Sequence, residues 1–141
     1  MRRGVTVPPG CPGVGDRIAG RYEVLEFIGA GGMGVVLAAR HLTLGHTVAL
    51  KLLKPEATES GVALERFLRE ARATVKMQTE HVAKVVDVGS LENGAPFIVM
   101  EHLFGQNLEE VLEQRGPLAV AEAAEYVMQA CEAIAEAHSF G

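Results

Sequence analysis

The hydrophobic and polar positions of this chain follow a strand-like period from residue 22 onward. Residues 22–28 alternate between two faces, as a half-buried β-strand does. The alternation assigns Tyr22, Val24 and Glu26 to one face and Glu23, Leu25 and Phe27 to the other. Short apolar runs at residues 35–40 and 47–53 predict two further strands. Since glycine-containing turns separate the three runs, we expect an antiparallel meander.

Two more strands are predicted further along the chain. Residues 82–91 and 97–100 are strand-like, and Glu92-Asn93-Gly94 between them is a favourable hairpin turn. The sequence therefore predicts five strands.

Three segments have the period of an α-helix. Residues 62–78 repeat apolar or small side chains three or four positions apart. Residues 108–115 predict a short helix that ends at Gly116-Pro117, and residues 120–139 predict a long one with an apolar stripe. The expected fold is α+β: a five-stranded antiparallel sheet with one packed helix, followed by two helices.

Composition narrows the possible functions. The chain has 141 residues, of which 48% are hydrophobic, and this suits one domain with a core. The net charge is −5 and no Lys/Arg run is present, so we expect no nucleic-acid partner. Glutamates interrupt the apolar stretch at residues 118–135, so we expect no membrane segment. Two isolated cysteines and scattered histidines indicate a cytoplasmic location and no metal site.

The N-terminal and C-terminal parts of the chain differ in charge and composition. Residues 1–20 are rich in Pro and Gly and lack apolar periodicity, which predicts a flexible leader. Residues 1–54 carry seven Lys or Arg against three Asp or Glu, whereas residues 101–141 carry one Arg against eight Glu. The front half would favour an anionic ligand, although the charge counts alone slightly favour the alternative of two differently solvated surfaces.

A glycine pattern, Gly29-x-Gly31-x-x-Gly34, lies between two predicted strands. Its position argues against a dinucleotide-binding fold, in which the pattern opens a helix. With Val36 after the last glycine and Val-Ala-Leu-Lys at residues 48–51, the order matches a glycine-rich loop followed by a strand lysine. A hairpin close to a triphosphate must exclude side chains so that backbone N–H groups face the oxygens. The alternative is a flexible hairpin with a solvated lysine.

With these motifs the chain resembles the Hanks-type protein kinases. Residues 29–36 (Gly-Ala-Gly-Gly-Met-Gly-Val-Val) are similar to the bacterial serine/threonine branch, and the resemblance covers residues 21–141. It implies an enzyme that transfers the γ-phosphate of ATP to Ser or Thr of a protein substrate. The implied division is the leader at 1–20, an ATP-binding N-lobe and hinge at 21–103, and the start of a C-lobe at 104–141.

The resemblance implies two catalytic residues. Lys51 would grip the α- and β-phosphates and pair with a glutamate of the following helix, for which Glu70 is the candidate. The alternative for Glu70 is a solvated helix-surface pair with Arg66.

The resemblance also implies the nucleotide contacts. Met100 would be the gatekeeper, and adenine would bond to the C=O of Glu101 and the N–H of Leu103. Asn107 would approach the ribose or simply cap the next helix. The apolar residues at 28, 36 and 49 would cover the purine, although they could equally be ordinary core. Together with these three, the implied contacts of the glycine hairpin and the following strands are Ile28, Gly29, Ala30, Gly31, Gly32, Met33, Gly34, Val35, Val36 and Ala49.

The family's catalytic segments do not occur in these residues. The long helix ends at His138-Ser139-Phe140-Gly141, before any H-R-D, D-F-G or A-P-E segment, so the ligands for Mg²⁺ are missing. We therefore expect ATP binding without phosphorylation by these residues alone. The apolar stripe of residues 118–139 would then be exposed and favour self-association. The alternative function is a pseudokinase-like docking module without catalysis.

Overall fold

The computed structural model describes residues 7–32 and 34–140. Six strands form one antiparallel sheet in the order β1-β2-β3-β4-β6-β5. They are β1 (Arg17–Ile18), β2 (Tyr22–Ala30), β3 (Gly34–His41), β4 (Thr47–Leu53), β5 (Val85–Ser90) and β6 (Pro96–Glu101). The helices are α1 (Pro55–Thr58), α2 (Gly61–Lys76), α3 (Leu108–Arg115) and α4 (Val120–Ser139). The predicted α+β class and the order of its elements are confirmed, with β1 and α1 as short additions.

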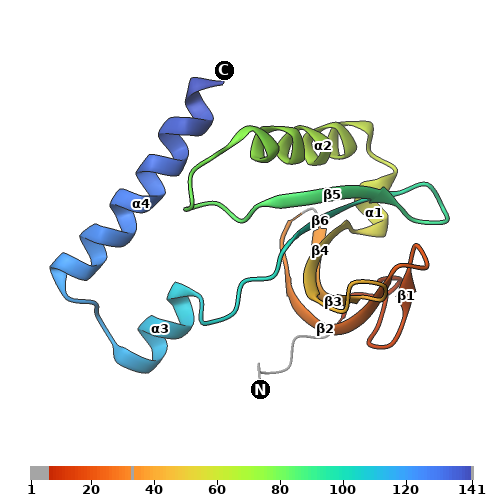
Figure 1. The fold of residues 1–141 in the computed structure, drawn as a ribbon, viewed down its shortest axis with the longest axis horizontal. Coiled ribbons are helices and arrows are strands. Elements are labelled where there is room, and N and C mark those ends of the chain that lie inside the picture. The colour runs from red at the N-terminus through yellow and green to blue at the C-terminus, as the bar shows by residue number, and fades with distance from the viewer. Residues whose placement is uncertain (1–6, 33, 141) are drawn as a thin grey trace.

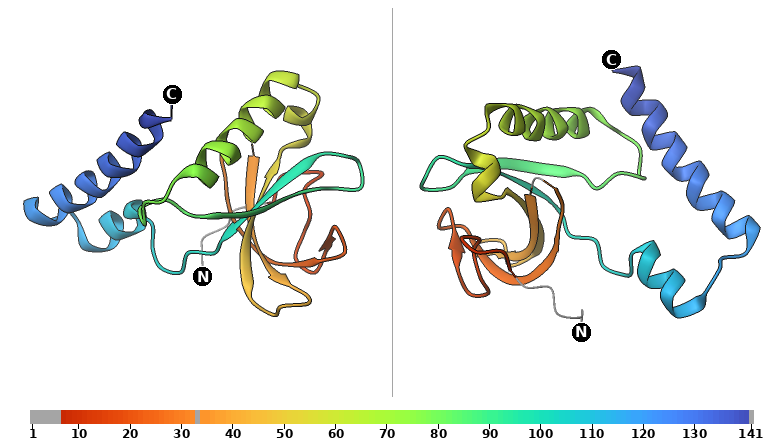
Figure 2. Two further views of the ribbon diagram at one scale, coloured as in Figure 1. Left: turned by 45° about the horizontal axis from the view of Figure 1, so that its top comes forward. Right: turned by 180° about the vertical axis from the view of Figure 1, so that it is seen from behind.

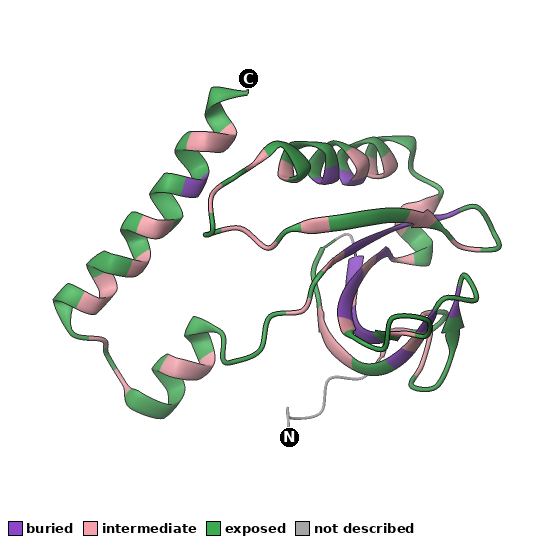
Figure 3. Cartoon of the chain, viewed as in Figure 1, coloured by how far each residue is buried: buried purple, intermediate pink, exposed green. Residues whose placement is uncertain are grey.

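The sheet curls strongly, and α2 lies along β5 on one side of it, while α3 and α4 stand apart (Figure 1). Alternate residues of β4 point into the curl, so Val48, Leu50 and Leu52 are at most 2% exposed. They form the main core together with Ile18, Tyr22, Val24, Val35, Leu37, Ala39, Phe97 and Val99. Figure 3 shows this buried set concentrated in the curled strands.

A second, smaller core joins α2 to the sheet. Phe67 and Ala71, one turn apart on α2, pack against Leu53 of β4 and Ile98 of β6. Ser60 caps the start of the helix by accepting a hydrogen bond from the N–H of Ala63 at 3.4 Å. The same face of α2 therefore contacts the face of β4 opposite the main core.

A bulge in β2 changes the predicted faces of that strand. Phe27 packs against the main core, on the same side as Tyr22 and Val24, so its predicted place on the opposite face is wrong. The pairing with β3 shifts register between Val24 and Glu26, and this extra residue reverses the alternation. Periodicity alone could not show the shift.

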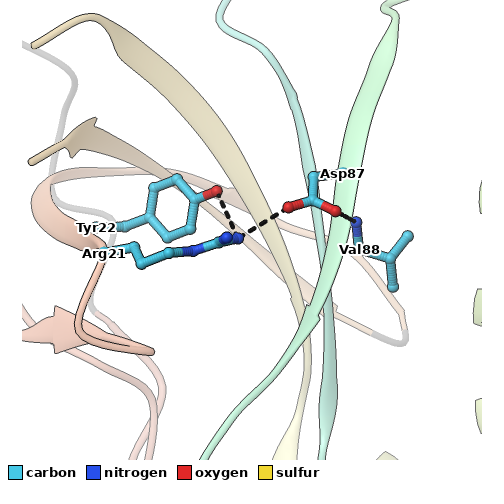
Figure 4. Close-up of polar contacts among 4 residues, drawn as sticks. All are labelled: Arg21, Tyr22, Asp87 and Val88. Carbon is cyan, nitrogen blue, oxygen red and sulfur yellow. Dashed lines mark hydrogen bonds and ion pairs between the residues drawn. The ribbon is translucent and has the colours of Figure 1, made fainter. Parts of the chain in front are cut away.

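Arg21 and Asp87 connect strands that are far apart in the sheet order. Arg21 Nη2, just before β2, donates to Asp87 Oδ2 of β5 at 2.8 Å and to the Tyr22 hydroxyl at 3.2 Å (Figure 4). The Val88 N–H donates to the other Asp87 oxygen at 2.8 Å. The Arg21 guanidinium and then this N–H hold the pKa of Asp87 below its usual value. The contact fastens the start of β2 to β5 across the curl.

Part of the predicted leader contacts the sheet. The Gly15 N–H donates to the carbonyl of Val24, whose own N–H donates to the carbonyl of Asp16, both at 2.9 Å. Ile18 is buried and Cys11 packs against the main core. Burial, and secondarily Glu56, raise the pKa of the Cys11 thiol. The region with defined structure thus begins before residue 21.

The two C-terminal helices are held mainly by their own local contacts. In α3, Asn107 accepts from the Glu110 N–H at 2.8 Å, and Glu110 in turn accepts from the Asn107 N–H, which completes a capping box. Ala133 is the one buried residue that the structure describes on α4. Among the described residues no helix is long and apolar enough to cross a membrane. The apolar stripe of α4 is exposed, and self-association through it stays a prediction.

Candidate functional site

One row of residues crosses the sheet beneath the glycine hairpin. Gly29 of β2 pairs with Val36 of β3, Val36 pairs with Lys51 of β4, and Lys51 pairs with Ile98 of β6. Directly paired residues of neighbouring strands point to the same face. The strand register therefore brings the glycine pattern and the lysine together, as the sequence predicts.

Lys51 contacts Glu70 through an ion pair. Alternation along β4 turns Lys51 away from the main core and toward α2. Burial of Phe67 and Ala71 against the sheet places Glu70 at the edge of the α2 interface, where its Oε1 meets the Lys51 Nζ. The side chain of Lys51 is 25% exposed and that of Glu70 is 51% exposed. The alternative pair of Glu70 with Arg66 is not observed.

A cavity of about 450 Å³ lies between the glycine hairpin and Lys51. Its lining consists of Ile28, Gly29, Ala30, Gly31, Gly32, Gly34, Val36 and Lys51. Val35, also a predicted contact, is fully buried in the main core, so only its backbone could approach a ligand here. Met33 lies outside the described residues.

The glycines of the hairpin differ in the space that a side chain would have at each position. A Cβ at Gly34 would lie 2.5 Å from the carbonyl oxygen of Leu52, so the close pairing of β3 with β4 requires glycine there. At Gly29, Gly31 and Gly32 a Cβ would meet nothing within 4 Å. Free space above the hairpin is thus found at Gly29, Gly31 and Gly32. Only at these three glycines would the absence of a side chain leave room for phosphates.

The residues predicted to form the hinge lie at the end of β6 and just after it. Among the described residues the Leu103 N–H makes no hydrogen bond, so it is free to donate to a ligand. Glu101 is tied to the loop before β5: its N–H donates to the Lys84 carbonyl at 3.0 Å and its carboxylate accepts from the Lys84 N–H at 2.7 Å. Ala49 is buried and pairs with Met100. Asn107 caps α3, as its alternative reading predicted.

The comparisons with known proteins agree with this geometry. The family model described as protein kinase domain matches residues 22–141. The chain belongs to the protein kinase domain family. It is 38% identical over 128 residues to the serine/threonine-protein kinase pkn3 of Myxococcus xanthus, covering 91% of this chain and 23% of that protein. It is 36% identical over 125 residues to the serine/threonine-protein kinase PrkC of Bacillus subtilis, covering 89% of this chain and 19% of that protein.

Solved kinase structures share the fold. The kinase domain of Mycobacterium tuberculosis PknI has a TM-score of 0.76 and 28% identity to this chain, covering 93% of it and 52% of the PknI chain. The chain therefore spans about half of that kinase domain and, at 23% and 19%, about a fifth of the curated relatives. The predicted resemblance to bacterial serine/threonine kinases is confirmed, and none of these relatives supports the alternative of a pseudokinase-like docking module.

A second cavity of this kinase domain was not predicted from the sequence. It has a volume of about 180 Å³ and lies behind the Lys51–Glu70 ion pair, next to Met100. Its other lining residues are Ala71, Thr74, Val82, Ala83, Val85 and Ile98. Thr74 lies one turn after Glu70 on α2, but nothing local in the sequence could indicate the loop residues.

The described residues offer no obvious place for a metal ion. Across residues 7–32 and 34–140, no three His, Cys, Asp or Glu side chains are grouped as a bound ion requires. Kinase domains use Mg²⁺ with ATP as a family.

Proposed function

We propose that this chain is the ATP-binding part of a serine/threonine protein kinase, which transfers the γ-phosphate of ATP to protein hydroxyl groups. The position of Lys51 carries the proposal, because it lines the cavity under the glycine hairpin and contacts Glu70 at the same time. An ammonium group held by a carboxylate presents one fixed positive charge to the phosphates. A cavity of about 450 Å³ is also within the usual range for small-molecule sites.

Each part of the site has a separate task in this proposal. Ile28 and Val36 pack on the purine faces, and the free Leu103 N–H and the Glu101 carbonyl bond the adenine edge. Lys51 neutralises charge on the α- and β-phosphates, and the exposed backbone of residues 29–32 lies over them. Serine/threonine specificity and a cytoplasmic location belong to the proposal too: the relatives' names favour the first, and two free cysteines favour the second.

The proposal separates binding from phosphoryl transfer. The family's catalytic loop and magnesium-binding segments do not occur in these 141 residues, and transfer depends on the positioning and charge stabilisation that they supply. These residues alone are expected to bind ATP but not to phosphorylate a protein. Transfer of radiolabel to a generic Ser/Thr substrate, abolished by Lys51→Met, would contradict this part.

ATP-dependent thermal stabilisation tests the binding. At about ten times its Kd, ATP should add about 1.4 kcal/mol to the free energy of unfolding, or about 4 °C in Tm. Lys51→Met should remove most of this shift, because the phosphates lose their cation. Lys54→Met is the matched control, since Lys54 directly follows the same strand but does not line the cavity. Equal ATP shifts in the wild-type chain and Lys51→Met would overturn the proposal.

A further inference from the structure

Helix α4 contacts the loop between α2 and β5, residues 77–84, through a carboxylate. Glu136 Oε1 accepts a hydrogen bond from the Gln78 N–H at 2.8 Å, and its Oε2 accepts one from the Thr79 N–H at 2.9 Å. Bonds from backbone N–H groups to a charged carboxylate are about twice as strong as neutral ones. One half-buried glutamate thus satisfies two backbone donors from a segment nearly sixty residues away.

A second contact lies one turn earlier on the same face of α4. Glu132 Oε2 lies 3.1 Å from Nε2 of His81 in the same loop. Ala133, between the two glutamates, is the buried residue of α4 and is 8% exposed. These two glutamates join α4 to the loop after α2, and Figure 2 shows the helix lying beside that loop.

The loop is physically continuous with the candidate ATP site. It begins directly after α2 ends at Lys76, which is six residues after Glu70. Its residues Val82 and Ala83 line the cavity of about 180 Å³ that Lys51 and Glu70 also line. A change in the path of this loop would therefore alter the cavity directly behind the ion pair.

The packing of helix α2 against the sheet is concentrated before its last turn. Phe67 and Ala71 are the buried residues of the helix, and both precede its last turn. From Arg72 onward the helix is mostly exposed, so its C-terminal end has few contacts of its own with the sheet. The loop that α4 contacts continues directly from that end.

We propose that Glu136, assisted by Glu132, is a positioning residue for nucleotide binding. By holding the loop after α2, it fixes the helix in the orientation that keeps Glu70 against Lys51. Glu136 contributes more than Glu132, because the Glu132–His81 contact is largely solvent-exposed, with Glu132 64% exposed. The proposal rests on the ATP-binding function proposed above and extends it to α4.

A double-mutant cycle distinguishes positioning from simple support of the fold. Glu136→Ala should raise the Kd for ATP by about three- to tenfold in the wild-type background. It should have little further effect in a Glu70→Ala background, because the residue through which it acts is gone. Adenosine lacks phosphates, so it should bind the wild-type chain and Glu136→Ala with the same Kd. Glu125→Ala is the matched control, because Glu125 contacts Gln129 of its own helix.

Amide hydrogen exchange without nucleotide gives an independent readout. Glu136→Ala should speed exchange from residue 70 to residue 82, whereas Glu125→Ala should not. If Glu136→Ala does not fold, Glu136→Gln should show a smaller effect of the same kind, since one amide oxygen can still accept.

Two results would overturn the inference. One is unchanged exchange in α2, and the other is an equal rise in Kd with and without Glu70. If the wild-type chain does not bind ATP at all, the proposed function fails, while the exchange result still decides whether Glu136 positions α2.

Discussion

The curled sheet and helix α4 both carry apolar residues at the expected period, but only the sheet buries them. On β4, Leu50 is 0% exposed, whereas Val127 and Ile134 on α4 are 61% and 53% exposed. Periodicity tells which side chains share a face, and burial requires a second surface to cover that face. The sheet provides its own cover by curling, and a single helix cannot. Figure 3 shows the contrast along the whole chain.

The largest expected difference between the two regions is in stability. Phe97 of β6 is 0% exposed and meets the Tyr22 ring edge-on, with 6.0 Å between ring centroids. Phe97→Ala should lower the free energy of unfolding by about 3–5 kcal/mol, because it removes a buried ring and leaves a cavity. Ile134→Ala on α4 should change it by no more than about 0.5 kcal/mol. Urea denaturation of both variants measures the difference.

An equally large loss in both variants would show that α4 is covered in solution. That result would favour the self-association predicted from the sequence, and it should then depend on protein concentration.

The sequence predicted best where local pattern decides the structure. The order of the glycine pattern and Lys51 along a predicted antiparallel meander indicated that they are neighbours, and the register of three strands places them together. The bulge near Leu25 was missed, because one extra residue leaves no mark in composition. The contacts of Glu136 were missed for another reason. They join segments far apart in the chain. From sequence alone, a charged residue on a helix surface is expected to be solvated, because its partner in the folded chain is not known.

A medium-sized effect should separate two glycines of the hairpin within the sheet region. Gly34→Ala places a Cβ 2.5 Å from the Leu52 carbonyl oxygen, so β3 and β4 must move apart. We expect a loss of about 1–3 kcal/mol in the free energy of unfolding without nucleotide. Gly32→Ala, whose Cβ meets nothing within 4 Å, should cost no more than about 0.5 kcal/mol. Similar losses for both would mean that backbone flexibility, and not the contact with β4, makes Gly34 necessary.

The smallest effect concerns the ion pair that closes the curl. The pKa of Asp87 in the folded chain lies below its ordinary value of 3.8, so its ion pair stabilises the fold fully at neutral pH. The contribution should fade as the pH drops below about 4, when Asp87 takes up a proton in the folded chain too. The Tm of the wild-type chain should therefore exceed that of Asp87→Asn at pH 7, and the two should converge as the pH falls through the lowered pKa of Asp87.

Comparing the two proteins at each pH is essential, because other carboxylates also titrate in this range and change both Tm values together. The difference should be small, since the side chains of Arg21 and Asp87 are 50% and 47% exposed, and it should shrink in 1 M salt. A Tm difference that stays constant from pH 7 to pH 3 would contradict the charge argument. The asparagine oxygen can still accept the hydrogen bond from the Val88 N–H, so loss of that bond would not explain such a difference. The shape of the side chain at position 87, and not its charge, would then fasten β5 to β2.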